Sequence, residues 1–330
     1  MLQSGEGEGL TAKSGQFGHT SGVAAVTRSL LVARSASCGR LWENTIRNMR
    51  QTMAAKKASV QTVAGIDIQN PAISNQDVMN GKLDQMIRLL EEQLHLQKVA
   101  LLEAGHILRF NGPGAMRIAF SLPDAQDDYL QRVILRTRGF YEARLLSMVA
   151  ALDLVGPESV VCDIGANIGN HTVYFGKVMG AAKVLAFEPQ AHCHATLTEN
   201  IALNGLQDRA VAYNCLIGAA TGNGAMARFS ARNLGGTAFT ARDDGNLPLF
   251  ALDDVIEAPD MARLDLIKVD VEGMQQEVLK GAEGVLDRRH PAIWIELLAK
   301  DNTFDLVRLY LERFGYKPTA LGFNDVLFRV

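Results

Sequence analysis

Two glycines and an acid follow a run of apolar residues near the middle of the chain, in the segment VVCDIGANIGNHT (residues 160–172). Asp163 precedes the turn, and three residues separate Gly165 from Gly169, one of them Asn167. In open α/β sheets, ligands bind where a parallel strand ends and the chain turns toward a helix. The segment therefore predicts a ligand-binding turn at the carboxyl end of a buried strand.

The spacing of this turn excludes two common phosphate-binding loops. The dinucleotide fingerprint requires GxGxxG, and Asn167 stands where its second glycine should be. No Gly-Lys-Ser/Thr follows, so the turn is not a Walker loop either. The carboxylate of Asp163 would repel a pyrophosphate, whereas it would attract a ligand with an ammonium or sulfonium group.

A second acid follows the next apolar run, LAFEP, in which Glu188 lies 25 residues after Asp163. A carboxylate at the tip of a second parallel strand can accept hydrogen bonds from both hydroxyls of a ribose. An acid before a glycine turn, the lack of a phosphate cradle and an acid for a ribose together favour S-adenosylmethionine as the cofactor. The alternative is an ordinary strand–helix turn with a helix-capping acid, which gives Glu188 no role.

Methyl transfer from a sulfonium needs few protein groups. Positive charge on sulfur falls during the displacement, so a carboxylate touching the sulfur would favour the ground state. The remaining tasks are to position the acceptor and to remove its proton. Asp270 in KVDVEG and Glu296 in WIEL are candidate bases because both follow strand-like apolar runs. His171 is a third candidate, since an imidazole can titrate near neutral pH.

Each of these candidates also has a structural alternative. Asp270 and Glu272 could cap the helix that follows them, Glu296 could be a structural anchor, and His171 could order the loop. Lys268 precedes Asp270 by two residues on the same strand face, so it could pair with Asp270 and keep that carboxyl ionised. The spacing of these acids fits no specific metal site, and we assign none.

Composition narrows the possible partners. The 330 residues carry a formal net charge of −3, and the Lys and Arg residues form no stripe, so nucleic acid is not an expected partner. No apolar run approaches the ~20 residues of a membrane span, so we expect a cytoplasmic protein. No CxxC pair occurs, which favours reduced, buried thiols over disulfides. The cysteines are Cys38, Cys162, Cys193 and Cys215.

From residue 159 onward, apolar strand-like runs alternate with helical stretches. This pattern predicts a Rossmann-like, doubly wound α/β fold with a mostly parallel sheet that is covered on both faces. We expect an irregular glycine-rich region up to about Asn246, and a terminal antiparallel hairpin about a Gly-Phe-Asn-Asp turn. The expected strands are VVCDI, KVLAF, AVAYNCLI, LDLIKVD and AIWIEL, and the expected helices cover residues 172–179, 193–203, 275–286 and 304–314.

The first part of the chain differs from the rest. Residues 1–80 lack sustained periodicity, so we expect a disordered tail or a linker. The stretch 10–42 contains no acid, which would suit a transit peptide, but Glu6 and Glu8 spoil that pattern. An upstream extension before a true start at Met53 is another interpretation.

Residues 81–157 are expected to form an extension that precedes a catalytic domain at 158–330. Within it, apolar residues at alternating four- and three-residue steps predict a helix over 82–104. Two alternating segments about residues 111–114 (Asn-Gly-Pro-Gly) predict a β-hairpin, and a long helix follows over 129–154. The helix over 82–104 could pair with a second copy and form a homodimer, or it could pack on its own domain.

The chain resembles the FkbM family of class I, S-adenosylmethionine-dependent methyltransferases over roughly residues 120–330. The resemblance implies O-methylation of a hydroxyl on a small-molecule or glycan acceptor, typically a sugar or a natural product. The matching segments are GFYEARLL, VVCDIGANIGNHTVYFGKV, VLAFEPQ, NLGGT, LDD, LIKVDVEGMQQEVLKGA and PAIWIEL. The residues that the resemblance assigns to the cofactor are Tyr141, Glu142, Asp163, Gly165, Asn167, Gly169, Glu188 and Asn214.

One position departs from the family pattern. The family often has an acid two residues after the glycine of VEG, where this chain has Gln275. If that acid takes part in catalysis, activity is in question; if it lies on the outer helix surface, the change is neutral. A non-catalytic S-adenosylmethionine-binding or scaffold protein that dimerises through 82–104 is therefore the alternative function. A nicotinamide oxidoreductase would share the fold class, but it would need the glycine spacing that is missing here.

Overall fold

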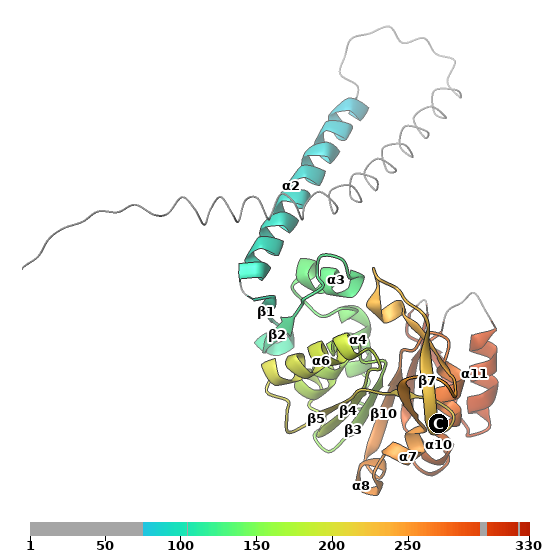
Figure 1. The fold of residues 1–330 in the computed structure, drawn as a ribbon. Coiled ribbons are helices and arrows are strands. Elements are labelled where there is room, and N and C mark those ends of the chain that lie inside the picture. The colour runs from blue at the N-terminus through green and yellow to red at the C-terminus, as the bar shows by residue number, and fades with distance from the viewer. Residues whose placement is uncertain (1–74, 104, 298–301, 323) are drawn as a thin grey trace, which may run out of the picture. The chain divides into compact units, whose positions relative to one another are not determined.

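The computed structural model of the chain describes residues 75–330, apart from residues 104, 298–301 and 323 (Figure 1). The expectations for the tail at 1–52 and for the first part of the linker lie outside the described residues. The linker was expected to reach residue 80, but helix α2 already begins at Asn75 and continues to Glu103. This helix extends through the region where the apolar repeat predicts one.

The main sheet confirms the predicted fold class. Its strands are β3 (Val160–Ile164), β4 (Lys183–Phe187), β5 (Ala210–Tyr213), β10 (Leu264–Val269), β11 (Ala292–Glu296), β12 (Lys317–Ala320) and β13 (Asp325–Arg329). They follow the order β12-β13-β11-β10-β3-β4-β5. The five strands from β5 to β11 are parallel, whereas β13 is antiparallel to both of its neighbours, as the terminal hairpin predicts.

The chain order within this sheet creates a switch point. The chain runs outward from β3 through β4 to β5 and then returns to place β10 on the other side of β3. Connections leave β3 and β10 in opposite directions, which opens a crevice between the carboxyl ends of these strands. The glycine turn follows β3, and KVDVEG includes the end of β10, so the topology brings both motifs to this crevice.

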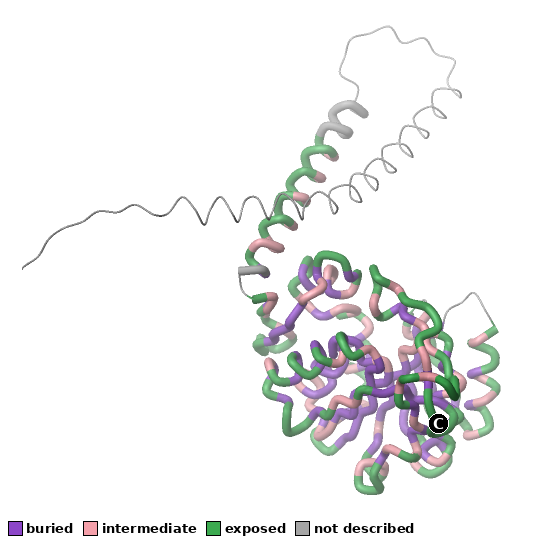
Figure 2. Tube along the Cα trace, in the orientation of Figure 1, coloured by how far each residue is buried: buried purple, intermediate pink, exposed green. Residues whose placement is uncertain are grey.

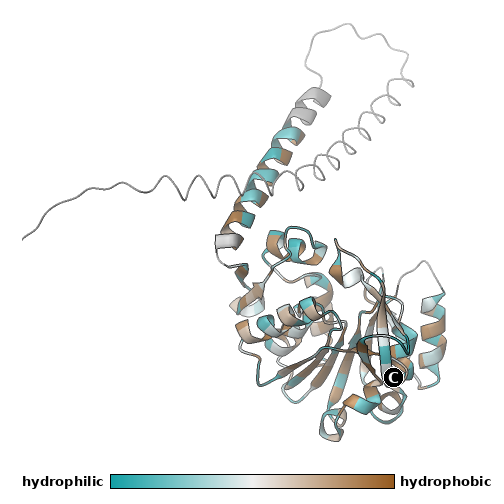
Figure 3. Ribbon diagram, viewed as in Figure 1, coloured by the Kyte–Doolittle hydropathy of each residue, from teal (hydrophilic) through white to brown (hydrophobic). Residues whose placement is uncertain are grey.

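Both faces of the sheet are buried, as continuous apolar strands require (Figure 2). Successive side chains of β3 alternate between two cores: Val161 belongs to one, and Val160 and Cys162 belong to the other. Figure 3 shows hydrophobic residues along these central strands. The free thiols of Cys162, Cys193 and Cys215 are buried, as expected, whereas Cys38 lies outside the described residues.

Two sets of helices, from different parts of the chain, cover the two faces of the main sheet. Buried side chains of each set join a different core, so the set before β5 lies on one face and the set after β9 (Leu247–Phe250) lies on the other. The first set comprises α3 (Tyr129–Thr137), α4 (Ala143–Ala150), α5 (Asn170–Val173) with the π-helical turn η2 (Tyr174–Val178), and α6 (Ala191–Leu203). The second set comprises α7 (Leu252–Val255), α9 (Gln275–Lys280), α10 (Glu283–Arg288) and α11 (Thr303–Glu312).

The expectation of one long helix over 129–154 is wrong. Helix α3 ends where Arg138 adopts a left-handed conformation with φ 48°, and Gly139 follows it. Helix α4 then starts after Glu142, which is also left-handed with φ 55°. A left-handed residue ends an α-helix because it turns the next carbonyl away from the helix axis. The break places Tyr141 and Glu142 on a connection rather than within a helix.

The region between β5 and β9 is also more regular than expected. The predicted strand AVAYNCLI is split, because β5 ends at Tyr213 and β6 (Leu216–Ile217) joins a second sheet. Strands β7 (Gly222–Arg228) and β8 (Ala238–Ala241) lie within the glycine-rich segment, and this four-stranded sheet has the order β6-β9-β7-β8. Glycine has a low strand propensity, so composition concealed these strands.

The predicted β-hairpin is present before α3. Strand β1 (Ile107–Asn111) pairs antiparallel with β2 (Arg117–Ser121), and the turn between them includes Pro113. The other edge of β2 is bonded by two side chains of the α6 region rather than by a strand. Asn204 exchanges two hydrogen bonds with the main chain of Ala119, and the Asn200 carboxamide oxygen accepts one from the N–H of Ser121 at 2.6 Å.

Helix α2 carries several exposed apolar side chains, among them Met86, Leu89, Leu90 and Leu96, whereas Leu101 near its end is buried. Homodimerisation through this helix stays a prediction. None of the helices in the described part of the chain combines the length and apolar character that crossing a bilayer demands.

Candidate functional site

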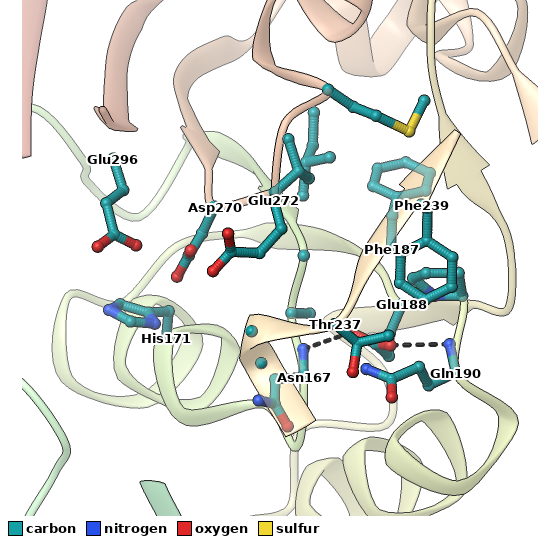
Figure 4. Close-up of a pocket in the computed structure, with 18 of the residues that line it drawn as sticks. Asn167, His171, Phe187, Glu188, Gln190, Thr237, Phe239, Asp270, Glu272 and Glu296 are labelled. Atoms are coloured by element: carbon teal, nitrogen blue, oxygen red, sulfur yellow. Dashed lines mark hydrogen bonds between the residues drawn. The ribbon is translucent and has the colours of Figure 1, made fainter. Parts of the chain in front are cut away.

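A cavity lies at the crevice between the carboxyl ends of β3, β4, β10 and β11 (Figure 4). Its wall includes the glycine turn, the ends of these four strands and part of the second sheet. Figure 4 shows Glu188 between Asn167 and Gln190 at one end, and Asp270, Glu272 and Glu296 near His171 at the other. Eight predicted site residues line this cavity: Tyr141, Glu142, Gly165, Asn167, His171, Glu188, Asp270 and Glu296. Asp163, Gly169 and Asn214 do not.

The glycine turn has a backbone that few residues can adopt. Gly165, Asn167 and Gly169 have φ values of 86°, 51° and 88°, and asparagine is among the residues that tolerate this left-handed region best. A Cβ on Gly169 would also lie 2.7 Å from the side chain of Leu197. The turn is therefore held by its sequence in one shape, which presents its main chain to the cavity.

Asp163 lies beneath this turn rather than in the cavity wall. Its side chain is 0% exposed, and one carboxylate oxygen accepts a hydrogen bond of 2.5 Å from the hydroxyl of Thr172. The other oxygen has no hydrogen-bond partner in the described part of the chain. The geometry thus gives Asp163 the position of a brace between β3 and α5, and it does not bring the carboxylate to a ligand.

Glu188 is held rigidly at one end of the cavity. The side chain is 3% exposed, and its two oxygens accept hydrogen bonds from the backbone N–H groups of Asn167 at 2.9 Å and Gln190 at 2.8 Å. Burial raises the pKa of Glu188 to about 7, although these hydrogen bonds act in the opposite direction. The carboxylate is thereby positioned to accept further hydrogen bonds from a ligand, most strongly when it is ionised.

Asn214 does not reach the cavity, although it stabilises the same end. Its side-chain amide donates hydrogen bonds to the carbonyls of Glu188 at 2.8 Å and Pro189 at 3.1 Å, so it fixes the chain just after β4. These bonds differ from the cofactor contact that the resemblance implies for Asn214.

An apolar slot that the sequence analysis missed adjoins Glu188. It is lined by Phe187, Leu216, Ile217 and Phe239, of which the last three belong to the second sheet. The ring of Phe187 stacks on that of Tyr213 with centroids 5.0 Å apart, which fixes its orientation. A flat, apolar ring could fit against these side chains. The alternation of apolar residues after Asn214 was the available signal, but we assigned it to the main sheet.

The opposite end of the cavity holds two neighbouring acidic residues, Asp270 and Glu296, at the ends of two strands that pair in register. Nζ of Lys268 lies 2.7 Å from Oδ2 of Asp270, which confirms the expected Lys268–Asp270 pair. Burial and the neighbouring Asp270 raise the pKa of Glu296 to about 8. Burial alone would raise the pKa of Asp270, but Lys268 and the hydrogen bonds outweigh it and lower that pKa.

His171 lies beside this pair. It is buried, and its Nε2 is 3.4 Å from a carboxylate oxygen of Glu142, without the geometry of a hydrogen bond. The ring packs edge-on against Trp294 with centroids 5.2 Å apart. An uncommitted ring nitrogen next to a cavity is available to a ligand.

The connection between α3 and α4 is tied to the glycine turn through Asn170. The side-chain oxygen of Asn170 accepts a hydrogen bond from the N–H of Tyr141 at 2.9 Å, and its amide donates one to the Tyr141 carbonyl at 3.1 Å. This buried asparagine, which we did not single out from the sequence, explains how Tyr141 and Glu142 reach the cavity wall.

The helix-capping alternative is wrong for Asp270 and Glu272. Helix α9 begins at Gln275, its N-cap is Met274, and no side chain caps it. Gln275 is buried, and its amide lies 3.4 Å from the carbonyl of Glu296. The position that departs from the family pattern therefore faces the strand ends, not the outer surface of the helix.

A short loop closes one side of the cavity. The N–H of Leu234 donates to the buried carboxylate of Asp128 at 2.8 Å, and the amide of Gln190 donates to the Leu234 carbonyl at 2.9 Å. Gly235 and Gly236 follow in this loop and line the cavity. Burial raises the pKa of Asp128.

The ionisable residues that line the cavity are predominantly acidic. Five acidic residues line it, and no Lys or Arg is among the described residues that do. Within the described ranges, no cluster of His, Cys, Asp and Glu side chains is arranged to hold a metal ion. The wall is therefore suited to a ligand that carries positive charge and hydroxyl groups, and it is unsuited to a diphosphate. The acids are Glu142, Glu188, Asp270, Glu272 and Glu296.

Comparisons with known proteins agree with this description. Residues 163–318 match the family model described as the methyltransferase FkbM domain. Methyltransferase sdnD of Sordaria araneosa is 29% identical over 194 residues, which cover 45% of this chain and 74% of that protein. The hexuronic acid methyltransferase AglP of Haloferax volcanii is 27% identical over 159 residues, which cover 47% of this chain and 62% of AglP.

A solved structure adds a weaker likeness. The crystal structure of methyltransferase FkbM from Methylobacillus flagellatus KT has 18% sequence identity and a TM-score of 0.41. The match covers 53% of this chain and 44% of that one, so the chain spans less than half of that protein's length.

Proposed function

Because residues 163–318 match the model of the FkbM methyltransferase domain, we propose that the protein transfers a methyl group from S-adenosylmethionine to a hydroxyl of a sugar or natural product. The observation that carries the proposal is the cavity wall, where five acidic residues and no described Lys or Arg surround a glycine turn. Such a wall favours a cofactor with ammonium and sulfonium groups over one with phosphates. The relative named for hexuronic acid supports a glycan or small-molecule acceptor.

The residues at the Glu188 end fit the adenosine part of this cofactor. The Glu188 carboxylate would accept hydrogen bonds from the ribose hydroxyls, and the adenine would lie in the apolar slot beside Phe187 and Phe239. Asp163 and Gly169 would act indirectly, because they hold the shape of the turn. Asn214 would likewise act by fixing the main chain after β4.

The residues at the other end fit the transfer itself. The cofactor, when bound, supplies an electrophilic methyl group, and the chain's own task is to orient the acceptor hydroxyl and take its proton. In this proposal Asp270 and Glu296 would take that proton. His171 would contact the acceptor or the amino-acid part of the cofactor, and Tyr141 and Glu142, which line the same cavity, would close that side.

Calorimetry with S-adenosylmethionine and NAD⁺ tests the cofactor assignment. We expect binding of S-adenosylmethionine alone, and a Glu188→Ala variant should bind it ~10–100-fold more weakly, since charge-assisted hydrogen bonds contribute roughly 1.5–3 kcal/mol. Glu277→Ala is a suitable control because Glu277 pairs with Lys280 outside the cavity. Binding of NAD⁺ instead, or equal affinity in all variants, would refute the assignment.

Release of S-adenosylhomocysteine tests catalysis. A panel of sugars and hydroxylated natural products should include at least one compound that increases this release in the wild type and not in Asp270→Asn. If the cofactor binds and no acceptor supports turnover, the non-catalytic alternative, to which Gln275 points, replaces the proposal.

A further inference from the structure

Asp270 and Glu296 are neighbours because of the register between two strands. Val269 of β10 lies opposite Ile295 of β11 in a parallel pair. Asp270 and Glu296 are the residues that directly follow these two. Both side chains line the same end of the cavity, and each acts on the pKa of the other (Figure 4). Two neighbouring carboxyl groups at a buried site favour holding one proton between them, because a negative charge on one opposes ionisation of the other.

Lys268 decides which carboxyl carries the charge. It is 2% exposed, and its Nζ contacts Oδ2 of Asp270 at 2.7 Å while lying 5.3 Å from the ring centroid of Trp294. The indole N–H of Trp294 donates to the buried Asp325 at 2.7 Å, which fixes the ring. The cation is thus held beside Asp270.

Other charges around the pair do not alter this assignment. Asp163 and Glu142 act on Lys268 and raise its pKa together with Asp270, although burial lowers it. Glu272 and Asp325 are further acids near Asp270, and both have a pKa raised first by burial. His171 acts in the same direction as Lys268 and lowers the pKa of Asp270. The acids around the pair oppose a second negative charge on it.

We propose that Asp270 and Glu296 work as one unit that holds a single proton, with Lys268 as the positioning residue that keeps the negative charge on Asp270. The inference rests on the proposed function and deepens it. As the acceptor oxygen forms its bond to the methyl carbon, the carbon–sulfur bond breaks and its electron pair stays on sulfur. The acceptor proton moves to Asp270, the pair becomes doubly protonated, and it returns the extra proton to water after the product leaves.

Infrared spectroscopy of the free protein tests the shared proton without an acceptor. The measurement uses a Glu188→Gln background, which removes the other cavity carboxyl that titrates near this range, at about 7. A protonated carboxyl has a distinct C=O band, and the protein in this background should lose one such band as the pH rises through about 8. Glu296→Gln should lack this transition. Glu277→Gln changes an exposed glutamate of α9 in the same way and should retain it. A transition that persists in Glu296→Gln, or none near this pH in the Glu188→Gln background alone, would overturn the proposal.

Lys268→Met tests the positioning role, since methionine has a similar length but no charge. Without the cation both carboxyls hold protons more strongly, so the transition should move to higher pH. A side chain with only a packing role would leave the transition where it is, which would overturn the assignment to Lys268. If this variant does not fold by circular dichroism, Lys268→Arg, which keeps the charge, should fold and keep the transition near that of the wild type.

Turnover separates the inference from the proposed function. Where an acceptor supports catalysis, the alkaline limb of the pH–rate profile should follow the infrared transition and disappear in Glu296→Gln. A protein that shows the infrared transition but no methyl transfer would refute the proposed function alone. An active enzyme without the transition would refute the shared proton alone.

Discussion

The α-carbon of Gly165 packs against the main-chain carbonyl of Asp270, so closely that a Cβ on Gly165 would lie 1.9 Å from that oxygen. The two residues stand 105 positions apart in the chain and belong to different motifs. Their contact fixes the distance between the glycine turn and the carboxyl pair.

Gly165→Ala should destabilise the protein severely. The substitution combines a left-handed backbone, with φ 86°, and a clash with main-chain atoms that cannot rotate away. Strain and overpacking each cost roughly 1–3 kcal/mol, which lowers the Tm of a domain of this size by on the order of 10 °C. Gly180→Ala is the matched control, because Gly180 has φ 77° and no atom within 4 Å of an added Cβ. Equal losses of Tm in both variants would show that the contact with Asp270 does not matter.

Cofactor affinity should depend on pH through Glu188. Burial raises its pKa to about 7, so below that pH the carboxyl is protonated and loses the charge that strengthens its hydrogen bonds to a ribose. We expect calorimetric affinity for S-adenosylmethionine to fall by up to about tenfold per pH unit below 7. Glu188→Gln should bind weakly with no such dependence; a sloped profile in this variant would assign the effect to another group.

The raised pKa of Glu188 also affects the stability of the protein without cofactor, with the opposite dependence on pH. The folded-state pKa of Glu188 is raised above its unfolded value, so this group contributes stability at low pH and loses it as the pH rises through about 7. Thermal melts without cofactor should therefore show a decrease in Tm over this range that is absent in Glu188→Gln.

Asp128→Ala should loosen the loop at 233–237. The buried carboxylate accepts hydrogen bonds from the N–H groups of Gln131 and Leu234, and the second bond ties the loop to the start of α3. Hydrogen exchange at Leu234 should become roughly 10–100-fold faster, as expected for a lost bond to a charged group. Asp127→Ala removes an exposed neighbouring acid and should leave the exchange at Leu234 unchanged. Unaltered exchange in Asp128→Ala would mean that other contacts hold the loop.

Thr172→Val should reduce stability rather than remove a cofactor contact. It leaves the fully buried carboxylate of Asp163 without its hydrogen-bond donor, which costs about 1–3 kcal/mol. Urea denaturation measures this loss. Thr198→Val is the control, since the Thr198 hydroxyl is exposed and bonds only a carbonyl of its own helix. A large loss of cofactor affinity at unchanged stability would instead place Asp163 in contact with the ligand.

The sequence predicted those elements whose signal is local. The apolar runs at 160–164 and 264–269 each became a parallel strand, and the acids that follow them reached one crevice, because parallel strands end at the same edge of a sheet. The proximity of Asp270 and Glu296 depends on strand register, and a run of apolar residues does not specify which strands become neighbours.

The features that were not predicted from the sequence depend on tertiary contacts or lack a local signal. Arg138 and Glu142 adopt left-handed conformations that their residue types disfavour, so tertiary contacts such as the bonds from Asn170 to Tyr141 determine the break. The second sheet was missed because glycine residues contribute no apolar alternation. The sequence predicted that Asp163 and Asn214 lie near the ends of strands, as they do. It does not reveal whether a side chain at such a position points toward the crevice or beneath it.

The pairing of Asn200 and Asn204 with β2 bears on how the protein behaves at high concentration. A free strand edge is a template onto which another polypeptide can add a strand, and such addition is a common route to fibrils. Here two carboxamides occupy the positions that an incoming strand would use, at Ala119 and Ser121. Side chains of the α6 region therefore block the addition of a strand from another molecule to this hairpin. Many proteins protect a free strand edge with charged residues instead.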